Sequence, residues 1–457
     1  MKPDGGSGQP SEDTIVAIAS AAGRGAIALV RLSGPEAFPL AAKHLREWPS
    51  EPRTSHLSDI FDGDQKLDQA LVTLFPGPNS FTGEDTVEFS THGGYLVPTT
   101  IVAALISSGA RQALPGEFTR RAVLNGKLDI LQAEAIGDLI DASSHTMQSA
   151  ALGQLDGGLS RRLLSLRSDL IGLEALIAYD VDFPEEDDGP IPRAGIEQAA
   201  AKIAISLDAL LATASAGEVI REGAIVVIAG PPNAGKSSLF NALLGRSRAI
   251  VTEIPGTTRD AIEAVIDSGK WPLRLVDTAG LRETEDRIER LGIEVSEEYL
   301  ANADVVLACA EDSRSLEGTL RLVVNRSPAP VLAVRTKSDL VSLREEITLP
   351  QAAISVSAES GSGLRDLLAA IDGTLDERHG EVAPDLPILT RARHRKAIST
   401  ARSEVDQFRT AWTEEKLPAT VASVHLRTAI GALEELIGSV DVEDVLDRVF
   451  SSFCVGK

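Results

Sequence analysis

The chain has 457 residues, of which 43% are hydrophobic, and a formal net charge of -23 at pH 7. One hydrophobic core rarely organises a chain of this length, so two or three domains are expected. The negative charge repels polyanions, which excludes a surface that binds nucleic acid throughout and confines any RNA contact to a local patch.

Cysteine usage and the ends of the chain bear on its compartment. Only Cys309 and Cys454 occur, so a disulfide framework is excluded and the reducing cytoplasm is the expected location. The first 13 residues lack the apolar region of a secretion signal. No apolar run reaches the ~18 residues of a membrane span, so we expect no membrane partner.

Residues 1–127 predict a compact α+β domain. Short β-rich runs at residues 14–19, 26–32, 70–75 and 86–90 alternate with turns that contain Gly and Pro.

From residue 128 the hydrophobic period becomes that of a helix. Apolar residues spaced three and four apart predict one stripe along a single long helix. They are Leu152, Leu155, Leu159, Leu163, Leu166, Leu170, Leu173 and Ile177. The stripe fits either a bundle core or a dimer seam. The acidic residues 180–192 contain prolines and predict a solvated loop rather than a metal site, and residues 196–221 predict a second helical run.

Residues 224–238 carry a phosphate-binding loop in its expected context. The apolar run 224–230 predicts a buried parallel strand, and the sequence PPNAGKSS follows directly. The glycines let backbone N–H groups curl around phosphates, and the following helix directs its N-terminus at the anion. We expect Lys236 to reach the β- and γ-phosphates and Ser237 to bind Mg²⁺.

Two further motifs belong to the phosphate side of the site. A predicted strand at residues 273–276 leads into Asp277-Thr278-Ala279-Gly280, where the aspartate would hold Mg²⁺ through water and the glycine would face the γ-phosphate. Thr258, within GTTRD at residues 256–260, is the switch hydroxyl expected on Mg²⁺ when triphosphate is bound.

Predicted strands at residues 305–310, 331–335 and 354–356 precede the base-reading motifs. These motifs are Thr336-Lys337-Ser338-Asp339 and Ser357-Ala358. Asp339 would accept hydrogen bonds from guanine N1–H and N2–H₂, a donor pair that adenine lacks, so ATP is rejected. Thr336 replaces the usual Asn and keeps a hydroxyl but not the amide, which leaves the affinity open.

The residue that orients the attacking water is not the usual glutamine. Leu281 occupies that position and cannot hydrogen-bond to water. Hydrolysis must use another polar group, and the candidates downstream are Glu283, Glu285, Asp286 and Glu289. Taken singly, each of these residues fits an exposed charge of a switch helix better than a catalytic group.

Residues 387–453 are again patterned as helices, so helices flank the nucleotide-binding region. Because domain termini often lie close together at the surface, this region is expected to be an insertion. The expected fold class is multidomain, α/β plus all-α. Its parts are an α+β domain at 1–127, a discontinuous helical domain at 128–222 and 378–457, and a P-loop GTPase domain at 223–377.

The sequence resembles the MnmE (TrmE) family of tRNA-modification GTPases over essentially the whole chain after Ser11. The resemblance rests on DTIVA (13–17), GRGA (23–26), FTGED (81–85), HGG (92–94), PGEF (115–118), NGKLD (125–129) and the terminal FCVGK (453–457). It implies an N-terminal domain that binds folate and mediates a homodimer. It also implies a discontinuous helical domain and an inserted Ras-like P-loop GTPase domain that dimerises when GTP binds.

The resemblance also implies a potassium site. In this family K⁺ takes the place of an arginine finger, and a fixed cation over the developing charge is a physically adequate substitute for a guanidinium. The positions similar to its ligands are Asn233, Thr252, Ile254 and Thr257. Glu289 resembles the glutamate that organises the attacking water.

The family acts in a heterotetramer with an FAD-dependent partner subunit of the MnmG (GidA) type. Together they add an aminomethyl or carboxymethylaminomethyl group to C5 of the wobble uridine of certain tRNAs. The one-carbon donor is 5-formyltetrahydrofolate or methylenetetrahydrofolate, and the positions that match folate contacts are Arg31, Glu88, Lys127 and Lys457.

Three further residues are singled out by their chemistry. Cys454 is expected as a nucleophile or a thiol beside the folate, and Cys309 as part of the core. His92 fits either a turn-stabilising role or a catalytic role.

The full set of expected GTP contacts is Asn233, Ala234, Gly235, Lys236, Ser237, Ser238, Thr252, Glu253, Ile254, Pro255, Gly256, Thr257, Thr258, Asp277, Thr278, Ala279, Gly280, Thr336, Lys337, Ser338, Asp339, Ser357, Ala358 and Glu359.

Two other functions remain open on the motifs alone. One is a regulatory or ribosome-assembly GTPase switch, and the other is a dimerisation scaffold that presents folate and tRNA to a partner enzyme. A switch of the first kind usually carries a basic RNA-binding module, which the segment after the GTPase domain does not display.

Overall fold

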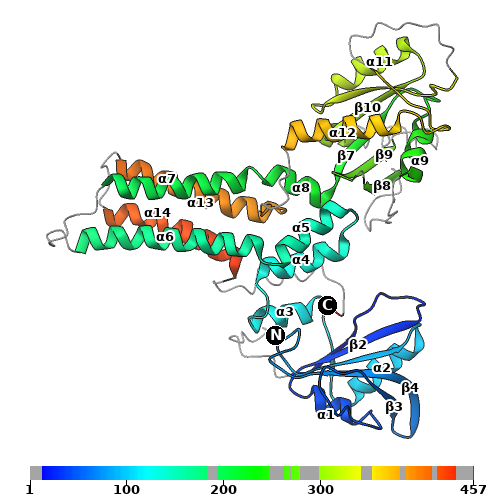
Figure 1. The fold of residues 1–457 in the computed structure, drawn as a ribbon, viewed down its shortest axis with the longest axis vertical. Helices are drawn as coiled ribbons and strands as arrows, with labels where there is room; N and C mark the ends of the chain where they lie inside the picture. Colours follow the sequence, from blue (N-terminus) through cyan, green and yellow to red (C-terminus); the bar gives the residue numbers. More distant parts are fainter. Residues whose placement is uncertain are drawn as a thin grey trace, which may run out of the picture. The chain divides into compact units, whose positions relative to one another are not determined.

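A computed structural model of the protein describes residues 13–182, 193–246, 262–267, 269–277, 298–340, 353–380, 387–413, 419–438 and 456 (Figure 1). Contacts divide the chain into two units, Met1–Gly137 with Glu434–Lys457, and Asp138–Leu433. Each unit is described by itself.

The first unit is built on a sheet of order β3-β4-β5-β2-β1-β6, antiparallel except for the parallel pair of β1 and β6. The strands are β1 (Ile15–Ile18), β2 (Ile27–Ser33), β3 (His56–Asp62), β4 (Gln65–Phe75), β5 (Thr86–His92) and β6 (Arg111–Gln112). Three helices accompany it: α1 (Ala37–Ala42), α2 (Leu96–Ser107) and α3 (Glu117–Leu124).

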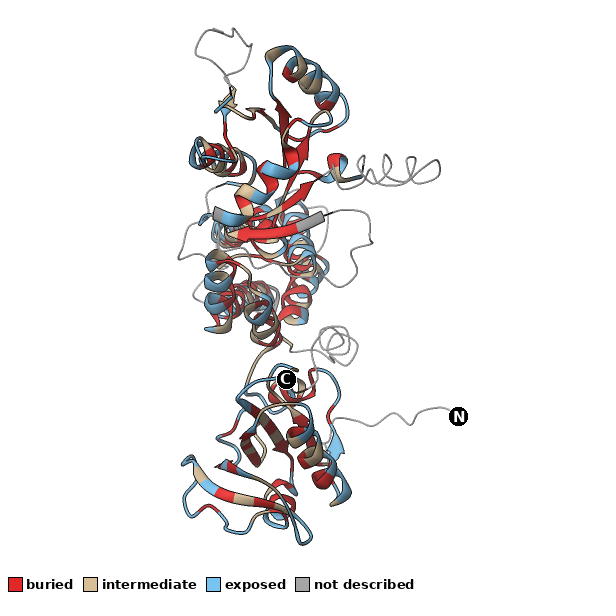
Figure 2. Ribbon diagram, turned by 90° about the vertical axis from the view of Figure 1, so that its right-hand side faces the viewer, coloured by how far each residue is buried: buried red, intermediate tan, exposed pale blue. Residues whose placement is uncertain are grey.

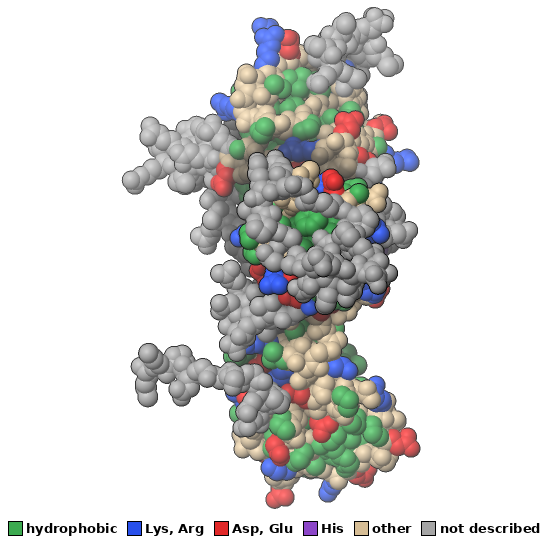
Figure 3. All heavy atoms as spheres, turned by 90° about the vertical axis from the view of Figure 1, so that its left-hand side faces the viewer, with side chains coloured by type: hydrophobic (Ala, Val, Ile, Leu, Met, Phe, Trp, Pro, Cys, Tyr) green, Lys and Arg blue, Asp and Glu red, His purple; other side chains and the backbone are tan. Residues whose placement is uncertain are grey.

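Strand alternation gives this sheet two different faces. Val30 and Leu32 on β2 point into an apolar core that includes residues of α1 and α2. Arg31, between them, therefore lies on the opposite face. Leu57 on β3 and Leu71 on β4 are exposed, and Figure 3 shows hydrophobic side chains gathered on one face of this unit.

The second unit begins with a helical part. Its helices are α4 (Ile130–Asp141), which starts in the first unit, α5 (His145–Leu155), α6 (Gly158–Asp182), α7 (Arg193–Leu211), α8 (Ala214–Glu222), α13 (Ala392–Thr413) and α14 (Ala419–Ile437). Helix α7 packs against both α6 and α13, and Glu174 of α6 accepts a hydrogen bond from Arg427 Nε of α14 at 2.5 Å. The stripe from Leu159 to Ile177 is buried in this bundle, which favours a bundle core over a dimer seam.

The prediction of one long helix through Leu152 and Ile177 is wrong. Helix α5 ends at Leu155 and α6 begins at Gly158, because Gly157 adopts a left-handed conformation with φ 78° that terminates a helix. Leu152 lies on the earlier helix and is 42% exposed. The second helical run is likewise divided into α7 and α8. Of the acidic residues 180–192, the first three complete α6 and the remainder lie outside the described residues.

One segment departs from the expectation that no apolar run is long enough to span a membrane. By length and composition, Ala194–Glu222 is long and apolar enough to cross a membrane, with a mean hydropathy of 1.6 over its most apolar window. Half of that window is buried inside the protein, where Ile203, Leu207 and Leu210 join the bundle core. The segment therefore has the burial of a core helix.

The rest of the second unit is a mostly parallel sheet of order β12-β11-β10-β7-β9-β8, in which only β8 runs antiparallel to its neighbour. Its strands are β7 (Ala224–Ala229), β8 (Ile262–Asp267), β9 (Pro272–Asp277), β10 (Val305–Ala310), β11 (Val331–Arg335) and β12 (Ile354–Ser355). Helices α9 (Lys236–Arg246), α11 (Ser313–Val324) and α12 (Leu364–His379) accompany them. Figure 2 shows buried residues concentrated along the strands and on the inner faces of the helices.

This sheet is inserted between α8 and α13, as the fold class predicts. Gly217 of α8 lies so close to the returning chain that a Cβ there would be 2.2 Å from the carbonyl oxygen of Leu389. Leu389 N also donates to Thr213 Oγ1 at 3.1 Å. The chain therefore leaves and re-enters the helical part beside α8. The domain limit proposed at residue 377 falls inside the last turn of α12, which runs to His379.

Candidate functional site

The phosphate loop follows β7 and leads into α9. Asn233 and Gly235 have left-handed φ values of 64° and 78°, which bends the loop between strand and helix. A Cβ at Gly230 would lie 2.2 Å from the carbonyl oxygen of Cys309 on β10, so only glycine fits where the loop begins. Ser237 and Ser238 are exposed in the first turn of α9, where N–H groups without partners in the helix can bind an anion.

Lys236 lies inside this loop. Its side chain is 6% exposed, and Nζ donates to the carbonyl oxygens of Gly230 at 3.0 Å and Pro231 at 2.9 Å. A phosphate is a stronger acceptor than a carbonyl, so a phosphate entering the loop finds the ammonium already positioned.

Asp277 ends β9 beside the phosphate loop. It is the register partner of Ile228 on β7 and is 1% exposed. Burial raises the pKa of the nearby Cys309 thiol to about 12, while the charge of Lys236 lowers it and that of Asp277 raises it further. Cys309 is free, buried and neutral, which confirms its place in the core.

The base-reading motif lies next to the phosphate loop. Thr336 Oγ1 donates to the carbonyl oxygen of Ala234 at 2.7 Å, and Thr336 N donates to Ala310 O at 2.9 Å. Lys337, with φ 54°, passes near Gly235 and forms an ion pair with Glu311. Glu311 was not among the expected residues.

The remaining parts of the motif extend to the surface. Ser338 N donates to Val356 O at 3.1 Å, which joins the motif to the Ser357 turn, and Asp339 is exposed. Ser357 is buried, and its Oγ accepts from Ser360 N at 3.2 Å. Ala358 and Glu359 follow in the same turn. The loop expected to bind the phosphates and the loop expected to bind the base, about a hundred residues apart in the sequence, are thus held together.

Several expected site residues lie outside the described residues. They are Thr252, Glu253, Ile254, Pro255, Gly256, Thr257, Thr258, Thr278, Ala279, Gly280, Glu283, Glu285, Asp286, Glu289, Cys454 and Lys457. Within the described part of the chain, no group of three or more His, Cys, Asp or Glu residues could hold a metal ion.

A second cluster of expected residues lies on the open sheet face of the first unit. Arg31 of β2 and Glu88 of β5 are opposite each other, and Glu88 Oε1 accepts from Arg31 Nη2 at 2.8 Å and Nε at 2.9 Å. The guanidinium also lies 5.3 Å from the ring centroid of Phe81 and 5.6 Å from that of Phe118, within the range of cation–π contact. Neither ring was expected at the site, although both belong to motifs that carry the family resemblance.

Lys127 approaches the same loop that carries Phe81. Its Nζ donates to Pro78 O at 2.9 Å, and a Cβ at Gly83 would lie 3.4 Å from its Cγ. Gly456, the residue before Lys457, is buried against β1, and a Cβ there would lie 2.1 Å from Ile18 O. Because Ala17 of β1 is opposite Arg31 of β2, the penultimate residue Gly456 contacts the strand that neighbours the strand of Arg31.

A buried charge cluster supports this end of the first unit. Arg121 is 3% exposed and donates to Asp13 Oδ1 at 2.7 Å, Glu117 Oε1 at 3.0 Å and Glu84 Oε1 at 3.2 Å. Burial raises the pKa of Glu117, but hydrogen bonds from Arg111, Leu114 N and Arg121 lower it more, so its net pKa falls below the ordinary 4.5. The cluster fixes α3 to the start of β1 and to the loop before β5.

His92 has a structural partner. Its Nδ1 lies 2.7 Å from Asp68 Oδ1, and its backbone N donates to Asp68 Oδ2 at 2.9 Å. These bonds tie the end of β5 to β4, which favours the turn-stabilising role over chemistry.

Comparisons with known proteins match both units. A family model described as the MnmE helical domain matches residues 130–454, and one described as the GTP-binding protein TrmE N-terminus matches residues 14–127. A protein of Heliobacterium modesticaldum is 43% identical over 97% of this chain and 99% of its own length. Proteins of Methylobacterium radiotolerans (42%, covering 97% and 99%) and Aquifex aeolicus (38%, covering 97% and 100%) are also similar. All three carry the name tRNA modification GTPase MnmE.

Proposed function

The chain belongs to the MnmE family of tRNA modification GTPases, and we propose that it is a potassium-stimulated GTPase that modifies C5 of the wobble uridine. The group added is aminomethyl or carboxymethylaminomethyl. An FAD-dependent partner subunit acts with the protein, and 5-formyltetrahydrofolate or methylenetetrahydrofolate donates the one-carbon unit. The proposal places the reaction in the cytoplasm.

The observation that supports the proposal is that one chain brings together two separate clusters of the expected site residues. The second unit holds a phosphate loop bonded to a base loop through Thr336 and Ala234. The first unit holds a sheet face where Arg31 of β2 pairs with Glu88 of β5, and Gly456 contacts β1, the other neighbour of β2. A simple GTPase switch needs only the first of these.

At the nucleotide site, the residues present suit a magnesium-bound guanine nucleotide. Ser237 and Asp277 supply the hydroxyl and carboxylate oxygens that Mg²⁺ prefers, with Thr258 as the proposed switch ligand. When bound, Mg²⁺ neutralises charge on the phosphates. Lys236 holds the phosphates, and Asp339 accepts from the guanine edge.

Potassium stimulation rests on an oxygen donor in the phosphate loop. Asn233 is exposed in the left-handed turn, where its amide oxygen suits an alkali cation, with Thr252, Ile254 and Thr257 as the other proposed ligands. When bound, K⁺ stabilises the charge that develops on the phosphates. Glu289 is proposed to orient the attacking water.

The folate site is proposed on the open face of the first unit. Glu88 would accept from the donor edge of a pterin, while Arg31, Lys127 and Lys457 suit the glutamate tail. Phe81, which is 37% exposed, offers aromatic surface beside Arg31 for the ring system, whereas Phe118 is buried and packs against the guanidinium from inside the protein. Cys454 is proposed as a nucleophile or a thiol near the folate. Exposed Leu57 and Leu71 support a homodimer formed through this unit.

Reconstitution tests the proposal. The purified protein, an FAD-dependent partner, a tetrahydrofolate donor, GTP and unmodified tRNA are combined in KCl, and the nucleosides are analysed by mass spectrometry. We expect a C5-modified wobble uridine, and slower GTP hydrolysis in matched NaCl. Unmodified uridine together with GTP-dependent association with ribosomes would instead favour a ribosome-assembly switch. Equal rates of GTP hydrolysis in KCl and NaCl would contradict the proposed potassium site.

A further inference from the structure

The β8–β9 hairpin connects the nucleotide site to the helical part of the second unit. At its open end, Ile262 of β8 pairs with Asp277 of β9, beside the phosphate loop. At its closed end, residues 269–271 form the turn. Strand β9 has six residues, so the turn lies about 17 Å from Asp277.

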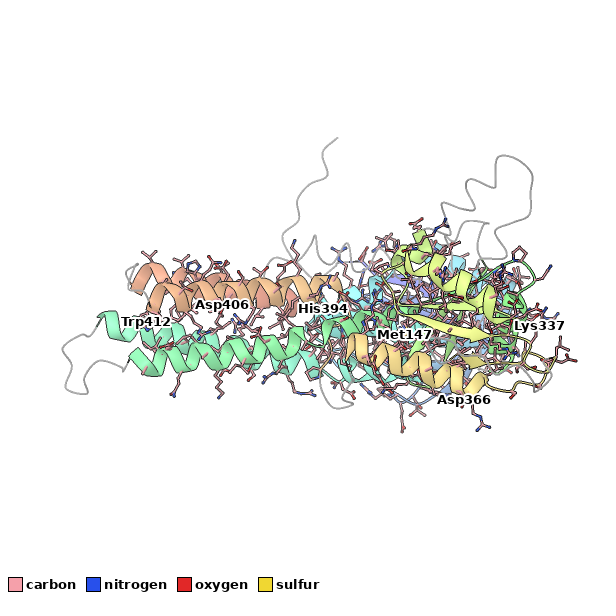
Figure 4. The ribbon with its side chains drawn as sticks, turned by 90° about the horizontal axis from the view of Figure 1, so that it is seen from above. Met147, Lys337, Asp366, His394, Asp406 and Trp412 are labelled. Atoms are coloured by element: carbon pink, nitrogen blue, oxygen red, sulfur yellow. The ribbon has the colours of Figure 1, made fainter. Side chains whose placement is uncertain are left out.

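The closed end of the hairpin is embedded in an apolar core that both parts of the unit share. Trp271 is 1% exposed, and it packs in one cluster with Met147 of α5, Ile220 of α8 and the strands of the sheet. Met147 is labelled in Figure 4, where the bundle helices meet the sheet. Well-packed cores transmit displacement because they have few voids into which side chains can relax.

Hydrogen bonds attach the same turn to α5. Thr146 Oγ1 donates to Lys270 O at 2.9 Å, and His145 N donates to Asp267 Oδ2 at 3.0 Å. The first residues of α5 thus hold the hairpin on both sides of its tip.

On the other side, Asp376 of α12 accepts from Trp271 Nε1 at 3.1 Å and from Lys270 Nζ at 2.5 Å. The hairpin is fixed to α12 through side chains of the turn, and to α5 through the carbonyl of Lys270 and the carboxylate of Asp267. Its movement relative to α5 would therefore change the bond of Thr146 first.

Space for such a movement exists beside the turn. A cavity of about 750 Å³ is lined by Lys270 and Trp271, by His145 and Arg161 of the helical part, and by the returning chain at Pro387. The cavity therefore borders the turn on the side of α5, next to the bond between Thr146 and Lys270 O.

We propose that this hairpin carries the nucleotide state from Asp277 to α5, and that Thr146 is a positioning residue that couples GTP turnover to tRNA modification. A ligand that shifts Asp277 moves a hydrogen-bonded pair of strands, and the turn passes that shift to α5. Thr146 contacts the closed end of the hairpin, away from Asp277 and the phosphate loop. Its loss should thus separate the two activities rather than abolish both.

Trp271 itself provides a direct probe. The chain has three tryptophans, so the full-length variant Trp48→Phe/Trp412→Phe retains Trp271 alone. We expect the emission of Trp271 to differ between the GDP-bound protein and the protein bound to a non-hydrolysable GTP analogue. Identical emission in the two states would overturn the proposal.

Thr146→Val tests the coupling independently of fluorescence. Thr319→Val is the matched control, because Thr319 Oγ1 also donates to a backbone carbonyl at 2.9 Å, but within α11. We expect Thr146→Val to hydrolyse GTP within about twofold of wild type, while modified nucleoside in tRNA of a complemented deletion strain falls about tenfold. The control should change neither quantity.

Two outcomes of this comparison would contradict the proposal. Wild-type levels of modified nucleoside with Thr146→Val would show that the bond is not needed for coupling. Parallel loss of GTP hydrolysis and modification would show that Thr146 only maintains the nucleotide site. If the strain that carries the wild-type gene contains the modified nucleoside, the proposed function holds. Either outcome then counts against the coupling alone.

Discussion

The hydroxyl of Thr336 donates a hydrogen bond to the carbonyl oxygen of Ala234, 2.7 Å away, although the two residues are 102 positions apart. Both residues are buried, so the bond joins the base loop to the phosphate loop away from solvent. A threonine in place of the usual asparagine therefore still supplies a donor that reaches the backbone of the phosphate loop.

Thr336→Val keeps the shape of the side chain and removes this donor. We expect the affinities for GTP and GDP to fall together by about tenfold, because a buried acceptor left without its partner costs roughly 1–3 kcal/mol. Isothermal titration calorimetry measures the change, and Thr336→Ser should retain wild-type affinity. A valine variant that binds as tightly as wild type would show that the bond is dispensable.

Asp339→Asn changes which base the site accepts. A carboxylate accepts from both guanine donors, whereas an amide offers one acceptor and one donor, which suits the carbonyl that xanthine carries at position 2. We expect GTP affinity to fall about a hundredfold, as losing a hydrogen bond to a charged group costs roughly 3 kcal/mol, and xanthosine triphosphate to bind better than GTP. Unchanged preference for GTP would place the base elsewhere.

Glu117→Gln removes one carboxylate from the Arg121 cluster. At pH 7 we expect the free energy of unfolding to fall by about 3 kcal/mol, because the buried guanidinium of Arg121 loses a partner. The pKa of Glu117 in the folded protein lies below its ordinary 4.5, so its contribution is present above that value and is lost as pH falls through the folded pKa. Thermal unfolding between pH 7 and pH 3 should show the variant and wild type converging in acid. A constant difference across that range would exclude the linkage.

Gly456→Ala tests whether the end of the chain belongs to the folate site. A Cβ there would meet Ile18 O at 2.1 Å, and φ is 103°. Strain of this kind alone costs roughly 1–3 kcal/mol, so we expect binding of 5-formyltetrahydrofolate to weaken at least about tenfold, with GTP hydrolysis unchanged. Gly172→Ala is the control, since nothing lies within 4 Å of a Cβ at that exposed position of α6. Equal folate affinity in all three proteins would place the folate elsewhere.

The features predicted from sequence are those encoded locally. The apolar strands around the phosphate loop and at residues 305–310 and 331–335 were located because runs of buried residues and adjoining motifs occur within a few positions. The break at Gly157 was missed because the leucine spacing is the same on both sides of it, and only the φ of that glycine ends the helix.

Contacts between distant segments could not be predicted in this way. Arg121 meets Asp13 across 108 positions, and Thr146 meets Lys270 across 124. Strand β8 was not predicted, and with it the hairpin that holds Trp271 was missed. The resemblance supplied Arg31 and Glu88 as separate contacts, whereas their pairing depends on the register of β2 and β5.

The most direct test of the function is mass spectrometry of tRNA nucleosides from a strain that lacks this gene, compared with the same strain carrying the wild-type gene or Lys236→Ala. We expect the C5-modified wobble uridine to disappear in the deletion strain, to return with the wild-type gene, and to stay absent with Lys236→Ala. The same modified nucleoside at wild-type abundance in all three strains would contradict the account.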